Sequence, residues 1–187
     1  MTNHTFKTML LWTGIASLAV FSSCSKEDDP EPLEQELITT VTLSLTKSGS
    51  STPVSISFKD PEGDGSGTIT PDTLVLEANA SYTGALTILN ETLSSTAEGY
   101  NVTAEIEEES NAHQFYYQAT GAQLTVTTTD VDSKNLPLGL KSTIATSTAS
   151  KGTLKVTLKH KPDEKAAGDA ITVGSTDVEV IFPVKIQ

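Results

Sequence analysis

Two histidines and a nearby group of glutamates are the residues of this chain best suited to chemistry. His113 follows the acidic segment Glu105–Glu109, and His160 ends a stretch in which apolar and polar residues alternate. Imidazole and carboxylate are ligands of Zn²⁺ and related transition metals, and imidazole also ligates haem iron. If the strand ends meet in space, His113, His160, Glu107 and Glu109 form a site for a divalent metal or haem. The alternative is a solvated acidic turn with two separate histidines at strand ends.

A second acidic segment resembles the beginning of a calcium-binding loop. Asp60, Glu62 and Asp64 supply oxygen ligands at its first, third and fifth positions, and Gly65 stands at the sixth, where a sharp turn is needed. The twelfth position, where a calcium loop carries glutamate, is Pro71. Because Pro, Gly and Asp also form ordinary turns, an acidic turn without a cation is the alternative.

The sequence predicts a binding or structural protein and no enzyme. The chain has no arginine and one cysteine, and it lacks a Gly-x-Ser-x-Gly elbow, a phosphate-binding loop and a His-Glu-x-x-His helix. The apolar loop Asn135–Leu140 forms a contact patch for a partner if it is exposed, or a buried corner at one end of the domain.

Alternation of apolar and polar residues with a period of two predicts the elements that position these groups. No window shows a sustained helical period, so we expect an all-β fold: an antiparallel β-sandwich, immunoglobulin- or cadherin-like, with about nine strands. Pro183 in the last strand suggests an edge strand or a bulge. The expected strands cover residues 37–45, 54–58, 74–78, 82–89, 100–106, 113–117, 124–126, 154–158 and 178–184.

The first 36 residues divide into a leader and a tether. Residues 1–23 have a short basic region and an uncharged apolar run, Met9–Phe21, which is shorter than the ~20 residues of a membrane-spanning helix. This pattern predicts a signal peptide, with an uncleaved N-terminal anchor as the alternative. Residues 24–36 are acidic and contain two prolines, so we expect an extended linker before the sandwich domain, residues 37–187.

Composition limits the partners of the mature chain. The formal net charge is −12, and removal of residues 1–23 removes Lys7 alone, leaving eleven lysines against 24 acids and a net charge of −13. Nucleic-acid binding requires clustered basic residues, so we expect no nucleic-acid partner.

The stretch around Cys24 resembles a bacterial lipobox, in which the cysteine receives a diacylglycerol group. Phe21 replaces the usual leucine, as in the looser boxes of Bacteroidota lipoproteins. The residues that follow resemble the lysine-plus-acidic signal that exports Bacteroidota lipoproteins to the outer face of the outer membrane; they are Ser25, Lys26, Glu27, Asp28 and Asp29. The resemblance implies a surface-exposed outer-membrane lipoprotein, with a periplasm-facing lipoprotein as the alternative.

The remainder of the chain is similar to small Bacteroidota lipoproteins that are often catalogued under a type 1 periplasmic-binding fold. The segments that carry the similarity are ELITTVTLSLT, FKDPEGDG, EEESNAHQFYY, LPLGL and DVEVIFPVKI. The resemblance implies a lipoprotein that works beside an outer-membrane transporter. We therefore expect a module that captures a ligand such as a metal, haem or glycan, with a structural or adhesive sandwich as the alternative.

Overall fold

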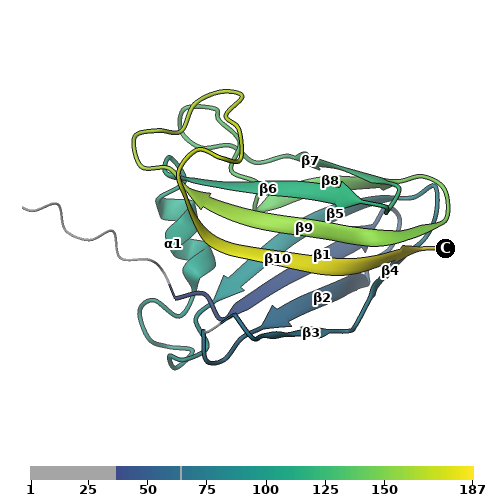
Figure 1. Ribbon diagram of the computed structural model, residues 1–187, viewed down its shortest axis with the longest axis horizontal. Coiled ribbons are helices and arrows are strands. Elements are labelled where there is room, and N and C mark those ends of the chain that lie inside the picture. Colours follow the sequence, from purple (N-terminus) through teal and green to yellow (C-terminus); the bar gives the residue numbers. More distant parts are fainter. Residues whose placement is uncertain (1–36, 64) are drawn as a thin grey trace, which may run out of the picture. The chain divides into compact units, whose positions relative to one another are not determined.

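The computed structural model describes residues 37–63 and 65–187, which form two β-sheets packed face to face (Figure 1). This arrangement confirms the predicted all-β sandwich. The predicted signal peptide, Cys24, the export signal and the acidic linker lie outside the described residues. No helix among the described residues has the length and apolar character needed to cross a membrane.

The larger sheet has six strands in the order β3-β2-β1-β5-β8-β7. Its pairings are all antiparallel, and β1 in its middle is joined to β2 along one side and to β5 along the other. The strands are β1 (Thr40–Lys47), β2 (Pro53–Lys59), β3 (Thr68–Thr70), β5 (Ser81–Leu89), β7 (Leu124–Thr128) and β8 (Lys141–Thr146).

The smaller sheet has four strands in the order β4-β10-β9-β6. They are β4 (Leu74–Leu76), β6 (His113–Thr120), β9 (Ser150–His160) and β10 (Ser175–Ile186). The long strands β9 and β10 cross in front of the larger sheet in Figure 1. The pairing of β4 with β10 is parallel, so the predicted antiparallel sandwich is wrong at this one edge.

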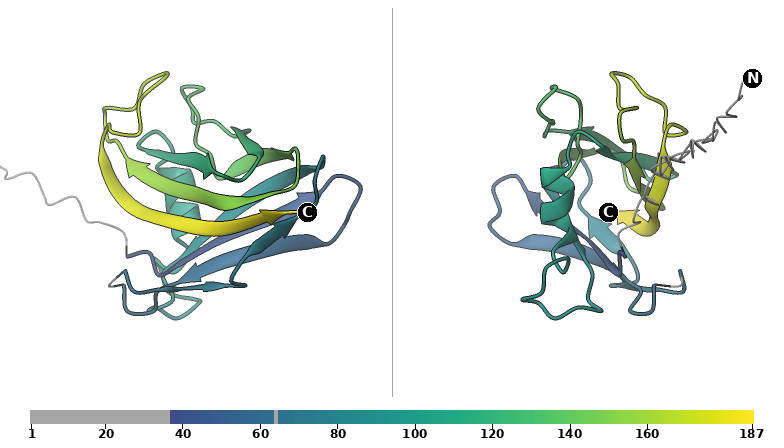
Figure 2. Two further views of the ribbon diagram at one scale, coloured as in Figure 1. Left: turned by 45° about the vertical axis from the view of Figure 1, so that its right-hand side comes forward. Right: turned by 90° about the vertical axis from the view of Figure 1, so that its left-hand side faces the viewer.

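Apolar side chains from the facing sides of both sheets form one core between them, seen from two further directions in Figure 2. Burial of each such side chain contributes about 1.5–3 kcal/mol. The core includes Val41, Leu43 and Leu45 of β1, Leu154, Val156 and Leu158 of β9, and Val180, Phe182 and Val184 of β10. The apolar loop at residues 135–140 joins this core through Leu138 and Leu140, so it is the buried corner and not an exposed patch.

The strand predicted over residues 100–106 is wrong, because this segment forms helix α1 (Val102–Glu108). Val102 and Ile106 are its buried residues, and a spacing of four fits both a strand, as two periods of two, and one helical turn. Ala104 and three glutamates favour the helix. In Figure 1, α1 lies at the end of the sandwich away from the C-terminus, beside the beginning of β6.

The remaining differences concern short elements. Strands β3 and β8 were not predicted, and eight of the nine expected strands are present, so the described residues contain ten strands in all. Pro183 does not mark a bulge, because the register shift of β10 falls between Thr176 and Val178. β10 as a whole is interior in its sheet, but Pro183 lies in the part of β10 that pairs with β9 alone, so it stands at a local edge. The parallel partner β4 pairs with β10 only from Val184 onward.

Candidate metal centre

The two histidines meet because β6 and β9 pair in antiparallel register. His113 is the first residue of β6 and lies directly opposite His160, the last residue of β9. Their rings stack with centroids 4.7 Å apart and planes 8° from parallel. The register therefore brings together two imidazoles that are 47 positions apart in the sequence.

His113 is held in one orientation by the end of α1. Its Nδ1 lies 3.2 Å from the backbone carbonyl oxygen of Glu109, which also accepts the N–H of Ala112. A carbonyl oxygen can only accept, so Nδ1 carries the proton of the neutral ring and Nε2 carries the lone pair. Burial lowers the pKa of His113, and the neighbouring His160 and Lys165 add to that effect against the opposing influence of Glu109. A neutral imidazole with a defined lone pair is the form that binds metal.

Of the two glutamates predicted to join the histidines, the structure brings one to the site. A ligand atom from each of Glu109, His113 and His160 can be chosen so that all three atoms lie within 4.8 Å of one another. Glu107 is exposed on α1 and does not belong to this group. The reason is the helix, because residues two apart lie on the same side of a strand but point to nearly opposite sides of a helix.

Asp177 is a buried acidic residue beside His113 that the sequence did not predict, although it does not belong to the group formed by Glu109, His113 and His160. Its Oδ2 lies 3.9 Å from Nε2 of His113, and the two side chains are 5% and 2% exposed. That oxygen accepts no hydrogen bond from the described residues. Burial raises the pKa of Asp177, while His160 and Lys159 act in the opposite direction.

A β-bulge explains why Asp177 was missed. In β10, Thr176 pairs with Lys159 and Val178 pairs with Leu158, so Asp177 is an extra residue with no partner on β9. Alternation counted back from Val178 assigns Asp177 to the solvent side, together with Glu179. Bulges re-aim side chains in this way, and no feature of the sequence marks this one.

The stacked rings limit which cofactors fit. Two histidines that ligate one haem bind on opposite faces of the porphyrin, whereas these rings are in stacking contact and leave no space between them. A small ion fits better, because tetrahedral Zn²⁺ with bonds of 2.0–2.2 Å separates its ligand atoms by about 3.4 Å. His160 is half-buried, so this side of the cluster is open to solvent.

Two buried lysines hold the loop that follows β9 against this end of the sandwich. The ammonium of Lys165 forms an ion pair with Asp132 at 2.8 Å and donates to the carbonyl oxygen of Ser110. The ammonium of Lys161 donates to Gln114 Oε1 at 3.1 Å and lies 4.7 Å from the ring centroid of Tyr116. These contacts fix the segments on either side of His113 and His160.

In the calcium-like loop, the first carboxylate, that of Asp60, accepts hydrogen bonds from backbone N–H groups of the same loop. Asp60 is buried, and its two oxygens accept the N–H groups of Gly63 at 3.0 Å and Gly65 at 2.6 Å. Glu62 is exposed, and Asp64 lies outside the described residues. These bonds are those of an acidic turn, and the calcium site stays a prediction.

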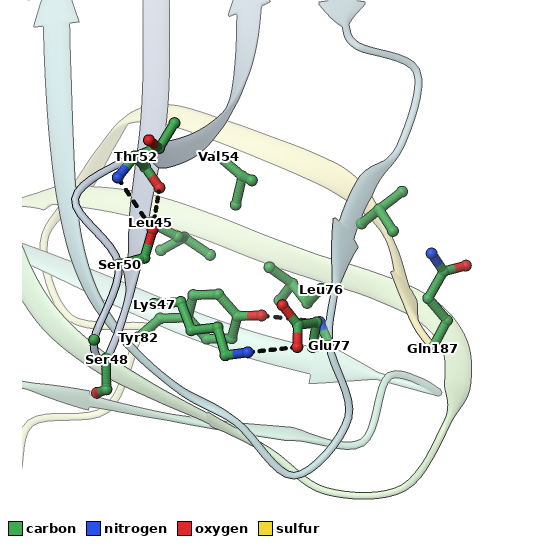
Figure 3. Close-up of a pocket in the computed structure, with 12 residues that line it drawn as sticks. Leu45, Lys47, Ser48, Ser50, Thr52, Val54, Leu76, Glu77, Tyr82 and Gln187 are labelled. Atoms are coloured by element: carbon green, nitrogen blue, oxygen red, sulfur yellow. Dashed lines mark hydrogen bonds and ion pairs between the residues drawn. The ribbon is translucent and has the colours of Figure 1, made fainter.

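A cavity of about 430 Å³ lies beside the β1–β2 turn and the C-terminal residue Gln187 (Figure 3). Its charged side chains, Lys47 and Glu77, form an ion pair, and Tyr82 OH accepts the N–H of Glu77 at 2.8 Å. Because these groups are paired and the Ser50 hydroxyl is hydrogen-bonded to the backbone of Thr52, the cavity offers a ligand mainly the hydroxyl groups of Ser48 and Thr52. The histidine cluster is chemically the better-defined site.

Comparison of the chain with protein-family models, curated proteins and solved structures finds no match.

Proposed function

We propose that this chain is a lipid-anchored protein of the outer membrane, exposed at the cell surface, that captures a divalent transition-metal ion for an outer-membrane transporter. Imidazole selects Zn²⁺, Cu²⁺, Ni²⁺ or Fe²⁺ over Ca²⁺ and Mg²⁺, which prefer oxygen ligands. The proposed activity is binding and delivery, without a catalytic step.

The histidine cluster is the single observation that carries this proposal. After removal of the leader, His113 and His160 are the only histidines in the sequence, and the fold stacks them against each other with a carboxylate nearby. If the two histidines were neighbours on the surface by chance, both would be expected to be exposed. His113 is 1% exposed, which is costly for a polar ring that serves packing alone.

The proposed location at the outer membrane is based on the sequence alone. Cys24 follows a short apolar run and precedes an acidic tether, and the resemblance to Bacteroidota surface lipoproteins extends through Asp29. The diacylglycerol group and an added acyl chain together give stable anchoring, which a single chain does not. A tether of about a dozen residues then holds the metal site within reach of a neighbouring membrane protein.

Metal content of the purified protein tests the function. We expect the full chain, carrying Cys24→Ala so that no thiolate competes, to bind one Zn²⁺ per molecule, measured by equilibrium dialysis and elemental analysis. His113→Ala and His160→Ala should each weaken binding at least 10-fold, because each removes a ligand. His4→Ala is the matched control and should bind as the parent does.

The same measurement separates capture from an adhesive role. If Zn²⁺ binding survives the double substitution of His113 and His160, the histidines are not the metal ligands. A protein without metal affinity that binds protein or polysaccharide would support the structural or adhesive alternative.

A further inference from the structure

Asp177 and His113 form an unusual buried pair. Nε2 of His113 carries a lone pair, because Nδ1 donates its proton to the carbonyl oxygen of Glu109. It faces Oδ2 of Asp177, and an ionised carboxylate is also an acceptor only. Two acceptors therefore face each other in a place where no described group donates to Oδ2.

The 3.9 Å separation of these two atoms decides what could join them. It is too long for a direct hydrogen bond, which requires about 2.5–3.2 Å. A bridging water would fit poorly, because two bonds of about 2.8 Å would have to meet at roughly a right angle, which is tighter than the tetrahedral arrangement of water. It lies within about half an ångström of the 3.4 Å that separates two ligands of tetrahedral Zn²⁺.

We propose, building on the function proposed above, that Asp177 is the carboxylate ligand of the metal, which binds Nε2 of His113, Oδ2 of Asp177 and the ring of His160. Glu109 also acts through its backbone carbonyl, which fixes the tautomer of His113. A metal-binding histidine commonly donates its other N–H to such an outer partner.

The bulge in β10 positions Asp177 beside His113. It turns Asp177 inward, to 5% exposure, whereas Glu179 two residues later is 43% exposed. Asp177 also lines a cavity of about 430 Å³ whose walls include the exposed residues Glu179 and Ile181. The cavity reaches the Asp177 side of the pair, and neither histidine lines it.

Zn²⁺ or Co²⁺ titration of three carboxamide variants tests the proposal. In the full chain with Cys24→Ala, we expect Asp177→Asn to weaken binding at least 10-fold. Glu179→Gln, the control outside the site, should stay within about threefold of the parent, and Glu109→Gln should weaken binding less than Asp177→Asn does. Thermal unfolding of the metal-free proteins checks that Asp177→Asn, which keeps the shape of the side chain, remains folded.

A readout on the unmutated side chains makes the test independent of folding. Long-range ¹H–¹⁵N spectra of the Zn²⁺ complex should show His113 metallated at Nε2 and protonated at Nδ1. Metallation at Nδ1, or a loss of affinity in Glu109→Gln with Asp177→Asn unaffected, overturns the assignment of Asp177 while leaving metal capture intact. A parent protein that binds neither ion overturns the proposed function and this inference together.

Discussion

Asp132 and Lys165 form the most deeply buried ion pair described in this molecule, with side chains that are 0% and 1% exposed. Asp132 also accepts the N–H groups of Lys134 and Leu136. Removal of one partner of a buried pair leaves the other charge uncompensated. We expect Asp132→Asn to lower the free energy of unfolding by about 3–5 kcal/mol in urea titrations. Glu179→Gln, which breaks the half-exposed pair with Lys155, is the control and should cost less than about 1 kcal/mol.

The same aspartate predicts a pH dependence of stability. Burial raises the pKa of Asp132, but the hydrogen bonds from Lys165, Leu136 and Lys134 outweigh it and lower the pKa below its ordinary value. The stabilisation is then present above the unfolded pKa of about 3.9 and is lost as the pH falls through the lower pKa of the folded state. The stability difference between wild type and Asp132→Asn should therefore shrink below about pH 4. A difference that stays constant through acid unfolding would contradict this account.

The sequence predicted some residues of the candidate site correctly and missed or misplaced others. His113 and His160 were found because each stands at the end of an alternating strand. Asp177 was not found, because a bulge changes which side of the sheet it faces and depends on how β10 pairs with β9. Glu107 was included wrongly, because its backbone is helical.

Among the elements, α1 is the segment whose apolar pattern fits both a strand and a helix, and contacts with β5 favour the helix in the fold. The hydroxyl of Thr103 donates to the carbonyl oxygen of Ile88 at 3.0 Å and accepts the Ile88 N–H at 2.7 Å. It takes the place of a strand partner on β5, because the pairing of β8 with β5 covers only Ser81–Ala85. The helix is therefore specified by tertiary contacts as well as by its own residues, and a reading of local pattern misses that contribution.

Thr103→Val tests this role of α1. The substitution keeps the shape of the side chain and leaves two backbone groups of Ile88 without their partner, so we expect a loss of about 1–3 kcal/mol in unfolding free energy. Thr127→Val, on an exposed position of β7, is the matched control and should change stability by no more than about 0.5 kcal/mol. Equal effects of the two substitutions would show that the Thr103 bonds add nothing to stability.

For the whole molecule, the sandwich was predictable because alternation reports which side of a sheet faces the core, and the two buried faces here meet in one core. The order of the strands was not predictable, because it depends on pairings between segments far apart in the chain, such as β4 with β10. The proposed metal site depends on such pairings, because β6, β9 and β10 each contribute one of its proposed ligands.

Attachment to a membrane is tested at Cys24. Thioether-linked diacylglycerol requires the cysteine sulfur, so Cys24→Ala should abolish incorporation of labelled fatty acid, measured by fluorography of the immunoprecipitated protein. Incorporation that persists in this variant would contradict the lipoprotein proposal.

The face of the membrane is a separate question, because lipidation is common to both orientations. If the lysine and acids after Cys24 direct export to the surface, replacing Lys26, Glu27, Asp28 and Asp29 by alanine should leave fatty-acid labelling unchanged and retain the protein on the periplasmic side. Digestion of intact cells by an added protease measures this: the parent domain should be cleaved or lost, and the variant protected until the outer membrane is permeabilised. Replacing Glu31, Glu34 and Glu36 by alanine removes a similar amount of negative charge further along the linker, and this control should stay protease-accessible. Protection of the parent in intact cells would instead place the proposed metal site in the periplasm, where it would receive ions that have already crossed the outer membrane.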